Sequence, residues 1–236
     1  MKKLKLCLLC LLTGSITMFV NAQSADDVIG KYITALGGAE KLKSLNTLKL
    51  TGTLSVQGNE VSIVINRKHM VGSRADFSIM GTENYQVLNT EKGWSFMPVQ
   101  GMTEPAEMPA DQFKTLQIQL DIQSPLLNYK DKGNQVELQR NEKINGEDCF
   151  NIKLTYKNGL PANIFISSKD YRIVKTTGKR AINGQDIDVE TTYSNYKQNT
   201  DGYWFAYTVS SNVQGETNFE KVETNIPVDD KIFKSN

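Results

Sequence analysis

The spacing of apolar residues changes near the start of the chain from a helical repeat to an alternating one. Residues 28–36 carry apolar side chains at helical spacing, which predicts an amphipathic helix. Ser24 and Asp27 have the spacing of a capping box before it, and the two glycines at 37–38 are typical of a helix end. A second, short helical turn is predicted around residues 42–45.

From residue 48 onward apolar and polar residues alternate, which predicts strands with one apolar and one polar face. Residue pairs that favour tight turns separate these runs: Gly58-Asn59, Asn158-Gly159, Asn183-Gly184 and Asp201-Gly202. The repetition predicts an up-and-down antiparallel sheet. A strongly twisted sheet of about ten strands must curl, which gives it a concave apolar face.

The alternation is interrupted between about residues 102 and 129. There Phe113, Leu116 and Leu120 repeat at helical spacing after Pro105 and Pro109, which predicts a mid-chain helix. This helix and the N-terminal helix are available to cover the concave face. Two alternatives stay open at this point: a half-barrel filled by its own side chains, or one with room for a ligand.

The first 22 residues have the composition of a secretory signal peptide. Three lysines precede an apolar stretch that is too short to span a bilayer, and Val20-Asn21-Ala22 supplies the small residues of a cleavage site. We expect cleavage near Ala22, a periplasmic location, and a single domain over residues 23–236, because no linker-like segment divides the rest of the chain.

Charge and residue content exclude several classes of function. Residues 1–22 hold three of the 27 basic residues and none of the 26 acidic ones, so residues 23–236 are nearly neutral, which gives no reason to expect nucleic acid as a partner. This part of the chain has one histidine, His69, and one cysteine, Cys149, too few for a zinc site. We expect His69 to be exposed at a strand end and Cys149 to be buried.

A carboxylate-based hydrolase is the enzymatic alternative. Asp186, Asp188 and Glu190 share one face of a predicted strand, opposite in phase to Ile187 and Val189. The alternation places these acids on the water side of the sheet and not in a cleft. We therefore expect a protein that is not an enzyme and that carries no cofactor and no metal.

Three stretches resemble the lipoprotein-carrier superfamily, which includes the periplasmic chaperone LolA and its outer-membrane receptor LolB. Residues 31–42 (KYITALGGAEKL) are similar to its opening helices, and residues 86–96 (QVLNTEKGWSF) to a hairpin that ends in an aromatic strand. Residues 225–233 (NIPVDDKIF) resemble its closing segment. The resemblance implies a mainly β fold: a curved antiparallel half-barrel of about eleven strands, covered by the N-terminal and mid-chain helices over an apolar cavity for acyl chains.

The resemblance also implies a function in outer-membrane lipoprotein sorting or in the transport of other lipid-like ligands. The partners would be acyl chains of lipids or lipoproteins, together with envelope membrane proteins, and we expect a monomer. A non-enzymatic envelope scaffold with a filled core is the alternative. The cavity and its cover would be formed by Arg67, Leu50, Ile63, Ile65, Trp94, Phe96, Phe113, Leu116, Leu120, Phe150, Ile152, Leu154, Ile164 and Ile166.

Arg67 has a specific expected role. It lies in Ile65-Asn66-Arg67-Lys68, where the LolA branch has Lys-Arg-Pro at the end of its second strand. In that branch the arginine hydrogen-bonds the covering helices when the cavity is empty. The resemblance implies that Arg67 holds the cover in the same way, although Lys68 stands where the proline would be. The alternative is a solvent-exposed arginine at a strand end.

Overall fold

A computed structural model describes residues 23–56, 58–182 and 184–235, so the expected signal peptide lies outside the described residues. The helices are α1 (Ala25–Ala35), α2 (Ala39–Lys43) and α3 (Ala110–Leu116), with 3-10 turns η1 (Pro98–Gln100), η2 (Gln117–Leu120) and η3 (Asp230–Phe233). The strands are β1 (Thr47–Val56), β2 (Asn59–Lys68), β3 (Gly72–Ile79), β4 (Thr82–Asn89), β5 (Gly93–Phe96), β6 (Ala106–Glu107), β7 (Gln135–Leu138), β8 (Glu142–Ile144), β9 (Glu147–Thr155), β10 (Pro161–Ser167), β11 (Ile173–Ile182), β12 (Gln185–Gln198), β13 (Trp204–Ser211) and β14 (Gly215–Thr224).

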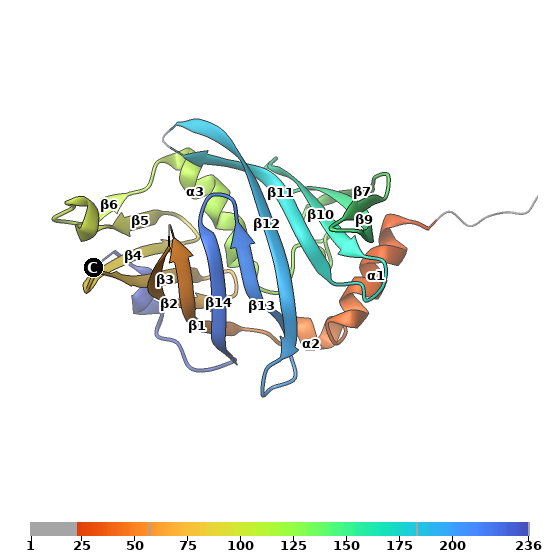
Figure 1. Cartoon of the computed structure of the whole chain (residues 1–236), viewed down its shortest axis with the longest axis horizontal. Coiled ribbons are helices and arrows are strands. Elements are labelled where there is room, and N and C mark those ends of the chain that lie inside the picture. Colours follow the sequence, from red (N-terminus) through yellow and green to blue (C-terminus); the bar gives the residue numbers. More distant parts are fainter. Residues whose placement is uncertain (1–22, 57, 183, 236) are drawn as a thin grey trace, which may run out of the picture.

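All the strands belong to one antiparallel sheet of fourteen strands, in the order β6-β5-β4-β3-β2-β1-β14-β13-β12-β11-β10-β9-β7, with β8 paired to β9. The first and last strands are neighbours in the middle of the sheet, and β6 and β7 are the ends of this path. The sheet curls without closing (Figure 1). The predicted mainly β half-barrel is confirmed, with three more strands than the approximately eleven expected.

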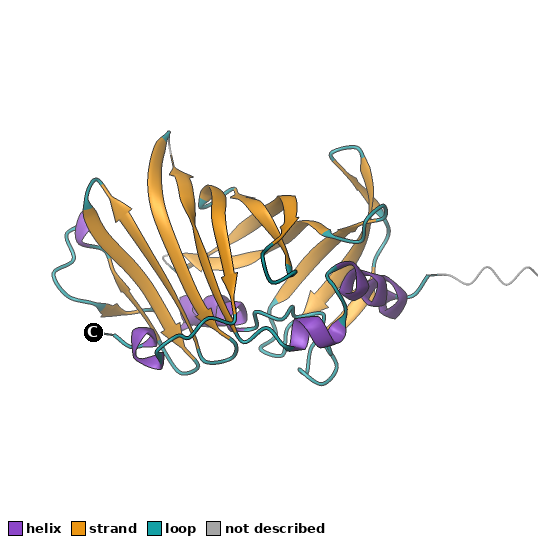
Figure 2. Cartoon of the chain, turned by 90° about the horizontal axis from the view of Figure 1, so that it is seen from below, coloured by secondary structure: helices purple, strands orange, loops and turns teal. Residues whose placement is uncertain are grey.

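The helices lie against the inner face of the curl. In Figure 1, α3 is seen behind β12–β14, and α1 lies at the opposite end beside β9 and β10. The view from below separates the two helices, with α1 at the right-hand end (Figure 2). No helix of the described residues is both long and apolar enough to cross a bilayer.

The predicted boundaries of α1 are confirmed. The Ser24 hydroxyl accepts a hydrogen bond from the Asp27 amide at 3.1 Å, and the Asp27 carboxylate accepts one from the Ser24 amide at 3.0 Å. This reciprocal pair satisfies two donors that a helix start leaves free. Gly37 and Gly38, at φ +107° and +95°, turn the chain out of the helix. Such positive φ values favour glycine because it has no Cβ to clash.

The C-terminal segment packs onto the outer face of the sheet. A Cβ atom on Gly72 of β3 would lie 2.3 Å from the ring of Phe233, so this position has no space for a larger residue. Lys68 also pairs with Asp230 at 2.6 Å. The outer face of β2–β4 is therefore covered near residues 230–233, while the inner face of the same strands carries the helices.

Candidate functional site

The inner face of the sheet can be followed from strand to strand by the pairing register. Leu50 on β1 lies opposite Ile65 on β2 and Val222 on β14, and Leu48 lies opposite Arg67. Directly paired residues share a face of a sheet. Leu50, Ile63, Ile65 and Arg67 of the predicted set therefore project from the same face as the helices.

An apolar group at the middle of this face, the central cluster, is only partly covered. Its buried members are Leu48, Leu50 and Val222. Five further apolar side chains pack against these and keep part of their surface accessible: Ile65, Ile122, Phe205, Tyr207 and Phe219. Accessible apolar surface on a concave face is the feature that a hydrocarbon chain would use.

A second group, the α1 cluster, fills the β9–β10 end of the inner face. It unites Val28, Ile29, Tyr32 and Ile33 of α1 with five residues of the predicted set: Phe150, Ile152, Leu154, Ile164 and Ile166. Ile152 and Leu154 have no exposed surface. These five residues belong to a fully packed part of the core. We call them the end wall of the concave face.

A third group, the α3 cluster, covers the β4–β5 end. Leu116 and Leu120 are buried with Leu88 and Met108, and Phe113 packs against them. A Cβ atom on Gly93 would meet Met108 and Phe113, so β5 and this part of the chain are in close contact. The predicted covering role of the segment 110–120, formed by α3 and η2, agrees with this position.

Trp94 and Phe96 do not belong to the concave face, contrary to our expectation. Gly93 pairs with Leu88, which contacts α3, whereas Trp94 pairs with Val87 and Phe96 with Tyr85. Successive residues of a strand point to opposite faces, so Trp94 and Phe96 project from the outer face. There the Phe96 ring lies 5.5 Å from that of Tyr85, measured between centroids.

Arg67 reaches the segment 110–120. Its Nη2 donates a hydrogen bond to Oε1 of Gln119, on η2, at 3.0 Å. Its Nε is buried without a hydrogen-bond partner among the described residues. Burial lowers the pKa of the guanidinium because the charged form loses hydration. The expected contact between this arginine and the covering segment is present, with a neutral amide as the acceptor.

Tyrosine hydroxyls surround the central part of the interior. Tyr32 donates to Ser124 Oγ at 3.0 Å, and Tyr193 lies 3.2 Å from the Thr176 hydroxyl. Burial raises the pKa of Tyr32 to about 12 and also raises the pKa of Tyr156 and of Tyr193. Tyr156 and Tyr193 nevertheless remain partly accessible. The interior thus combines apolar side chains with buried and half-buried hydroxyl groups.

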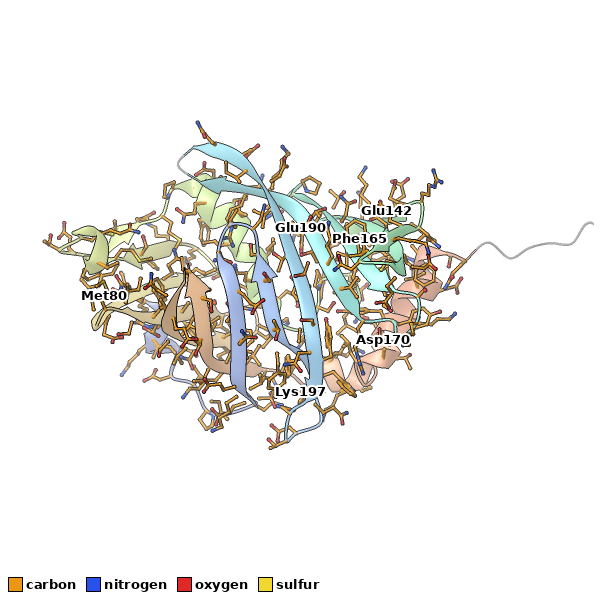
Figure 3. All side chains as sticks on the ribbon, in the orientation of Figure 1. Met80, Glu142, Phe165, Asp170, Glu190 and Lys197 are labelled. Atoms are coloured by element: carbon orange, nitrogen blue, oxygen red, sulfur yellow. The ribbon has the colours of Figure 1, made fainter. Side chains whose placement is uncertain are left out.

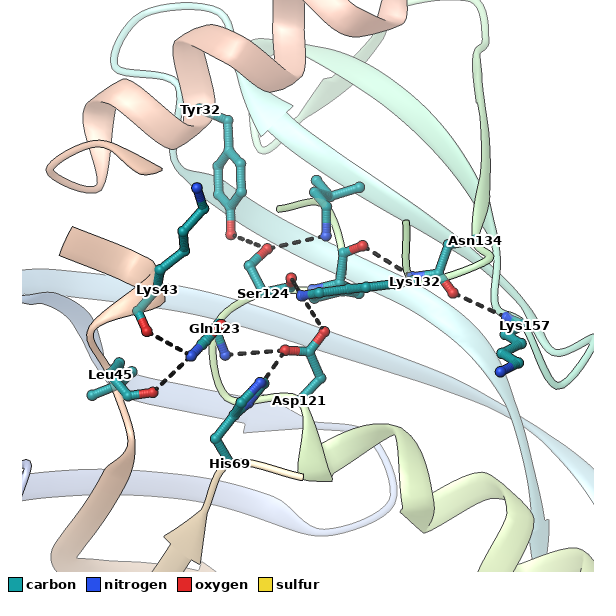
Figure 4. Close-up of polar contacts among 12 residues, drawn as sticks. Tyr32, Lys43, Leu45, His69, Asp121, Gln123, Ser124, Lys132, Asn134 and Lys157 are labelled. Carbon is teal, nitrogen blue, oxygen red and sulfur yellow. Dashed lines mark hydrogen bonds and ion pairs between the residues drawn. The ribbon is translucent and has the colours of Figure 1, made fainter. Parts of the chain in front are cut away.

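A polar network fixes the loop that follows η2 (Figure 4). Asp121 accepts a hydrogen bond from Lys132 Nζ at 2.6 Å and lies 3.7 Å from Nδ1 of His69. Gln123 donates to the carbonyls of Lys43 at 2.9 Å and Leu45 at 3.0 Å. Because this loop is bonded to the end of α2 and to the β2–β3 turn, it joins the two covering helices into one layer.

His69 belongs to this network and is not the exposed strand-end residue that we predicted. Its side chain is 22% exposed, and its Nδ1 is buried without a hydrogen-bond partner among the described residues. Desolvation lowers the pKa of His69, and the nearby Asp121 carboxylate opposes part of that shift. Sequence reasoning missed Asp121 because the two residues are 52 positions apart and their contact is tertiary.

The outer face carries the acids considered for a hydrolase. Glu190, labelled in Figure 3, pairs with Lys175 at 2.5 Å, and Asp188 pairs with Lys179 at 3.5 Å. Both acids line an open hollow of about 460 Å³. The predicted water-side placement is confirmed. No group of three or more potential metal-ligating side chains occurs among residues 23–56, 58–182 and 184–235. Cys149 is buried, as expected.

These features define a class of proteins built from one curved antiparallel sheet with helices on its concave face. Solved structures of that class are similar to this chain. A LolA superfamily protein from Nitrosomonas europaea superimposes with a TM-score of 0.56 and 14% identity, covering 91% of this chain and 99% of that one. A putative outer membrane lipoprotein-sorting protein domain from Vibrio parahaemolyticus superimposes with a TM-score of 0.53 and 16% identity, covering 88% of this chain and 94% of that one.

A DUF1329 family protein from Desulfovibrio piger gives a TM-score of 0.57 at 11% identity and covers 90% of this chain and 98% of that one. No family model and no curated protein matches the sequence. At these identities the likeness concerns the fold. The chain therefore has the fold of LolA superfamily proteins, as the three sequence stretches predicted.

Proposed function

We propose that this protein is a periplasmic carrier that binds a lipid-like ligand, such as the acyl chain of a lipid or lipoprotein. The ligand would lie against the central cluster, beneath the segment 110–120. The observation that carries the proposal is the partly accessible apolar surface at the centre of a concave face whose two ends are closed. Each buried methylene of such a ligand contributes about 0.8 kcal/mol, so affinity would not need a catalytic group.

Entry of the ligand would require displacement of the segment 110–120. Among the described residues, four hydrogen bonds attach it to other elements: Arg67 to Gln119, Gln117 to the Thr90 carbonyl, Asn158 to the Lys114 carbonyl, and the Met70 amide to the Leu120 carbonyl. Each such bond contributes only about 1 kcal/mol net. A seven-residue helix is also too short to be stable without tertiary packing. The hydrogen bonds and the helix itself therefore oppose opening only weakly. The main cost is the exposure of Leu116 and Leu120, whose apolar contacts the tail of the ligand would replace.

The predicted site residues would have different roles, according to their positions. Leu50, Ile63 and Ile65 would form the floor of the site, and Phe113, Leu116 and Leu120 its movable roof. Arg67 would hold the roof closed. The five β9–β10 residues would act as a fixed end wall, which supports the floor without contacting the ligand in the closed state.

Two neighbouring substitutions on β2 test the proposal. Ile65 belongs to the central cluster, whereas Val64 points to the opposite face. We expect Ile65→Gln to lower the uptake of a fluorescent fatty acid by the purified, delipidated protein at least about tenfold, because an amide would be buried against hydrocarbon. Val64→Gln should leave uptake unchanged. Equal uptake by both variants and the original chain, or none by any of them, would overturn the proposal.

The scaffold alternative has an observation of its own in favour. The α1 and α3 clusters are closed by the side chains of this protein, and an open hollow lies on the outer face of the sheet. A protein with a filled core would carry no lipid when purified and would take up none afterwards. Native mass spectrometry of the protein before and after delipidation distinguishes the two functions.

A further inference from the structure

Arg67 is a half-buried cation whose Nε is buried and which has no anion beside it within the described residues. Among the described residues it forms no ion pair, and its one hydrogen-bond partner is the neutral amide of Gln119. Arg74 and Arg172 instead pair with Asp76 and Asp170. A charge that is withdrawn from water is normally paired in proteins, since otherwise it loses hydration without gaining a partner. An anion bound beside the guanidinium would compensate that loss.

The surroundings of Arg67 suit the polar end of an amphiphile. The guanidinium projects from the same face as Leu50 and Ile65, at the edge of the central cluster. Across the interior, its positive charge acts on Tyr193, where it opposes the rise in the pKa of the hydroxyl. The Tyr156 side chain, by contrast, packs against the α1 cluster. A cation at the margin of an apolar surface is the arrangement that the anionic end of an amphiphile would use.

We propose that Arg67 binds the anionic head group, a carboxylate or a phosphate, of a single-chain amphiphile whose hydrocarbon tail lies on the central cluster. This inference rests on the proposed carrier function and specifies its ligand class. The unpaired Nε and the Nη2 group lie on one edge of the guanidinium, the geometry that accepts two oxygens of one anion. The Tyr193 hydroxyl, on which the charge of Arg67 acts, is an additional donor.

Three probes with the same hydrocarbon tail separate the contribution of the head group to affinity from that of the tail: dodecanoate, dodecyl phosphate and dodecanol. We expect the unmodified protein to bind one or both anions roughly 10–100 times more tightly than the alcohol, since hydrogen bonds to charged groups are the stronger ones. The ratio between the two anions identifies carboxylate or phosphate as the preferred head group. Displacement of a fluorescent fatty acid, measured above neutral pH, gives all three affinities.

Three variants test whether the charge of Arg67 is responsible. Arg67→Gln should abolish the preference for the anions, measured within that variant as the ratio of the anion affinities to the dodecanol affinity. Gln119→Ala removes the partner on η2 but keeps the cation, so the preference should remain. Arg180→Gln is the matched control, because Arg180 pairs with Ile187 on the same face and also lacks a carboxylate partner within the described part of the chain.

The outcomes separate this inference from the function on which it rests. Equal affinity of the unmodified protein for dodecanol and the anions would overturn the head-group site but leave the carrier function standing. If Arg67→Gln and Arg180→Gln lose the preference for anions equally, that preference arises from general electrostatic attraction. This outcome would also overturn the head-group site. If none of the probes binds, both proposals fail. Thermal unfolding of each variant verifies that it is folded.

Discussion

At the scale of single residues, burial changes the chemistry of polar side chains whose types are ordinary for a protein surface. Arg67 and His69 are neighbours on the chain, yet Arg67 contacts the segment 110–120 and His69 faces Asp121 in the loop after it. Both are tied to the layer that covers the sheet. Their ionisation and hydrogen bonding therefore affect the cover more directly than the sheet.

His69 should make stability depend on pH. Its pKa in the folded protein is lower than the ordinary value of 6.5, so the unfolded chain takes up a proton first as the pH falls below 6.5. The free energy of unfolding should decrease in that window, with a slope of at most about 1.4 kcal/mol per pH unit from this group. Urea titrations should give a flatter profile for His69→Asn than for the original chain. Parallel profiles would show that His69 does not carry the effect.

At the scale of elements, α1 is fixed by its own caps and by the sheet, whereas α3 depends on its packing. The start of α1 has a complete capping box, while Pro109 at the start of α3 supplies no side-chain cap. We therefore expect α3 to move before α1.

Two substitutions in α1 should have opposite effects. Ser24→Ala removes the capping box and should lower the free energy of unfolding by about 1 kcal/mol. Gly30→Ala should raise it by roughly 0.5–1 kcal/mol, because Gly30 is exposed within the helix and a Cβ there meets nothing within 4 Å. Chemical denaturation of the two variants gives both values. A Gly30→Ala variant that is less stable than the original would show that α1 is not the regular helix described.

The segment 110–120 should open more readily than the rest of the fold. Its amide hydrogens should exchange before those of β9 and β10. Arg67→Leu and Gln119→Ala should each speed that exchange, and the double variant should be no faster than either single one, because both remove the same hydrogen bond. Mass spectrometry of exchanged peptides measures this. Additive effects would mean that the two residues act independently.

At the scale of the whole molecule, the concave face is uneven: closed at both ends and partly open in the middle. In a solid core each apolar residue would contribute similarly to stability. Here the central residues have accessible surface left, so they should contribute less to stability than the end-wall residues and more to ligand binding.

A pair of isoleucines tests this difference. Ile152→Ala should cost about 2–5 kcal/mol, because Ile152 is fully buried in the α1 cluster and its removal leaves a cavity. Ile65→Ala should cost less than about 2 kcal/mol, because part of Ile65 is already accessible. Urea unfolding of both variants measures the two costs. Equal, large losses would instead indicate a solid core at both places and favour the scaffold function.

Much of the fold could be predicted because its signals are local. The capping box, the glycines after α1, the alternation in β1 and β2, and the helical spacing of Phe113, Leu116 and Leu120 are all read within a few residues. The residues of the candidate site were harder to predict in this way. The alternation within β5 shows that Trp94 and Phe96 share a face of the strand. Only the pairing of β5 with β4 shows that this face points away from the helices.

The sequence by itself determined the mainly β architecture, the two covering helices and the water-side position of the acids on β12, because backbone propensity and the period of apolar residues are properties of short segments. Tertiary structure alone decided that Arg67 meets Gln119, that His69 meets Asp121, and that the central cluster stays partly uncovered. Those features arise from contacts between residues far apart in the chain, whose meeting depends on how the sheet curls.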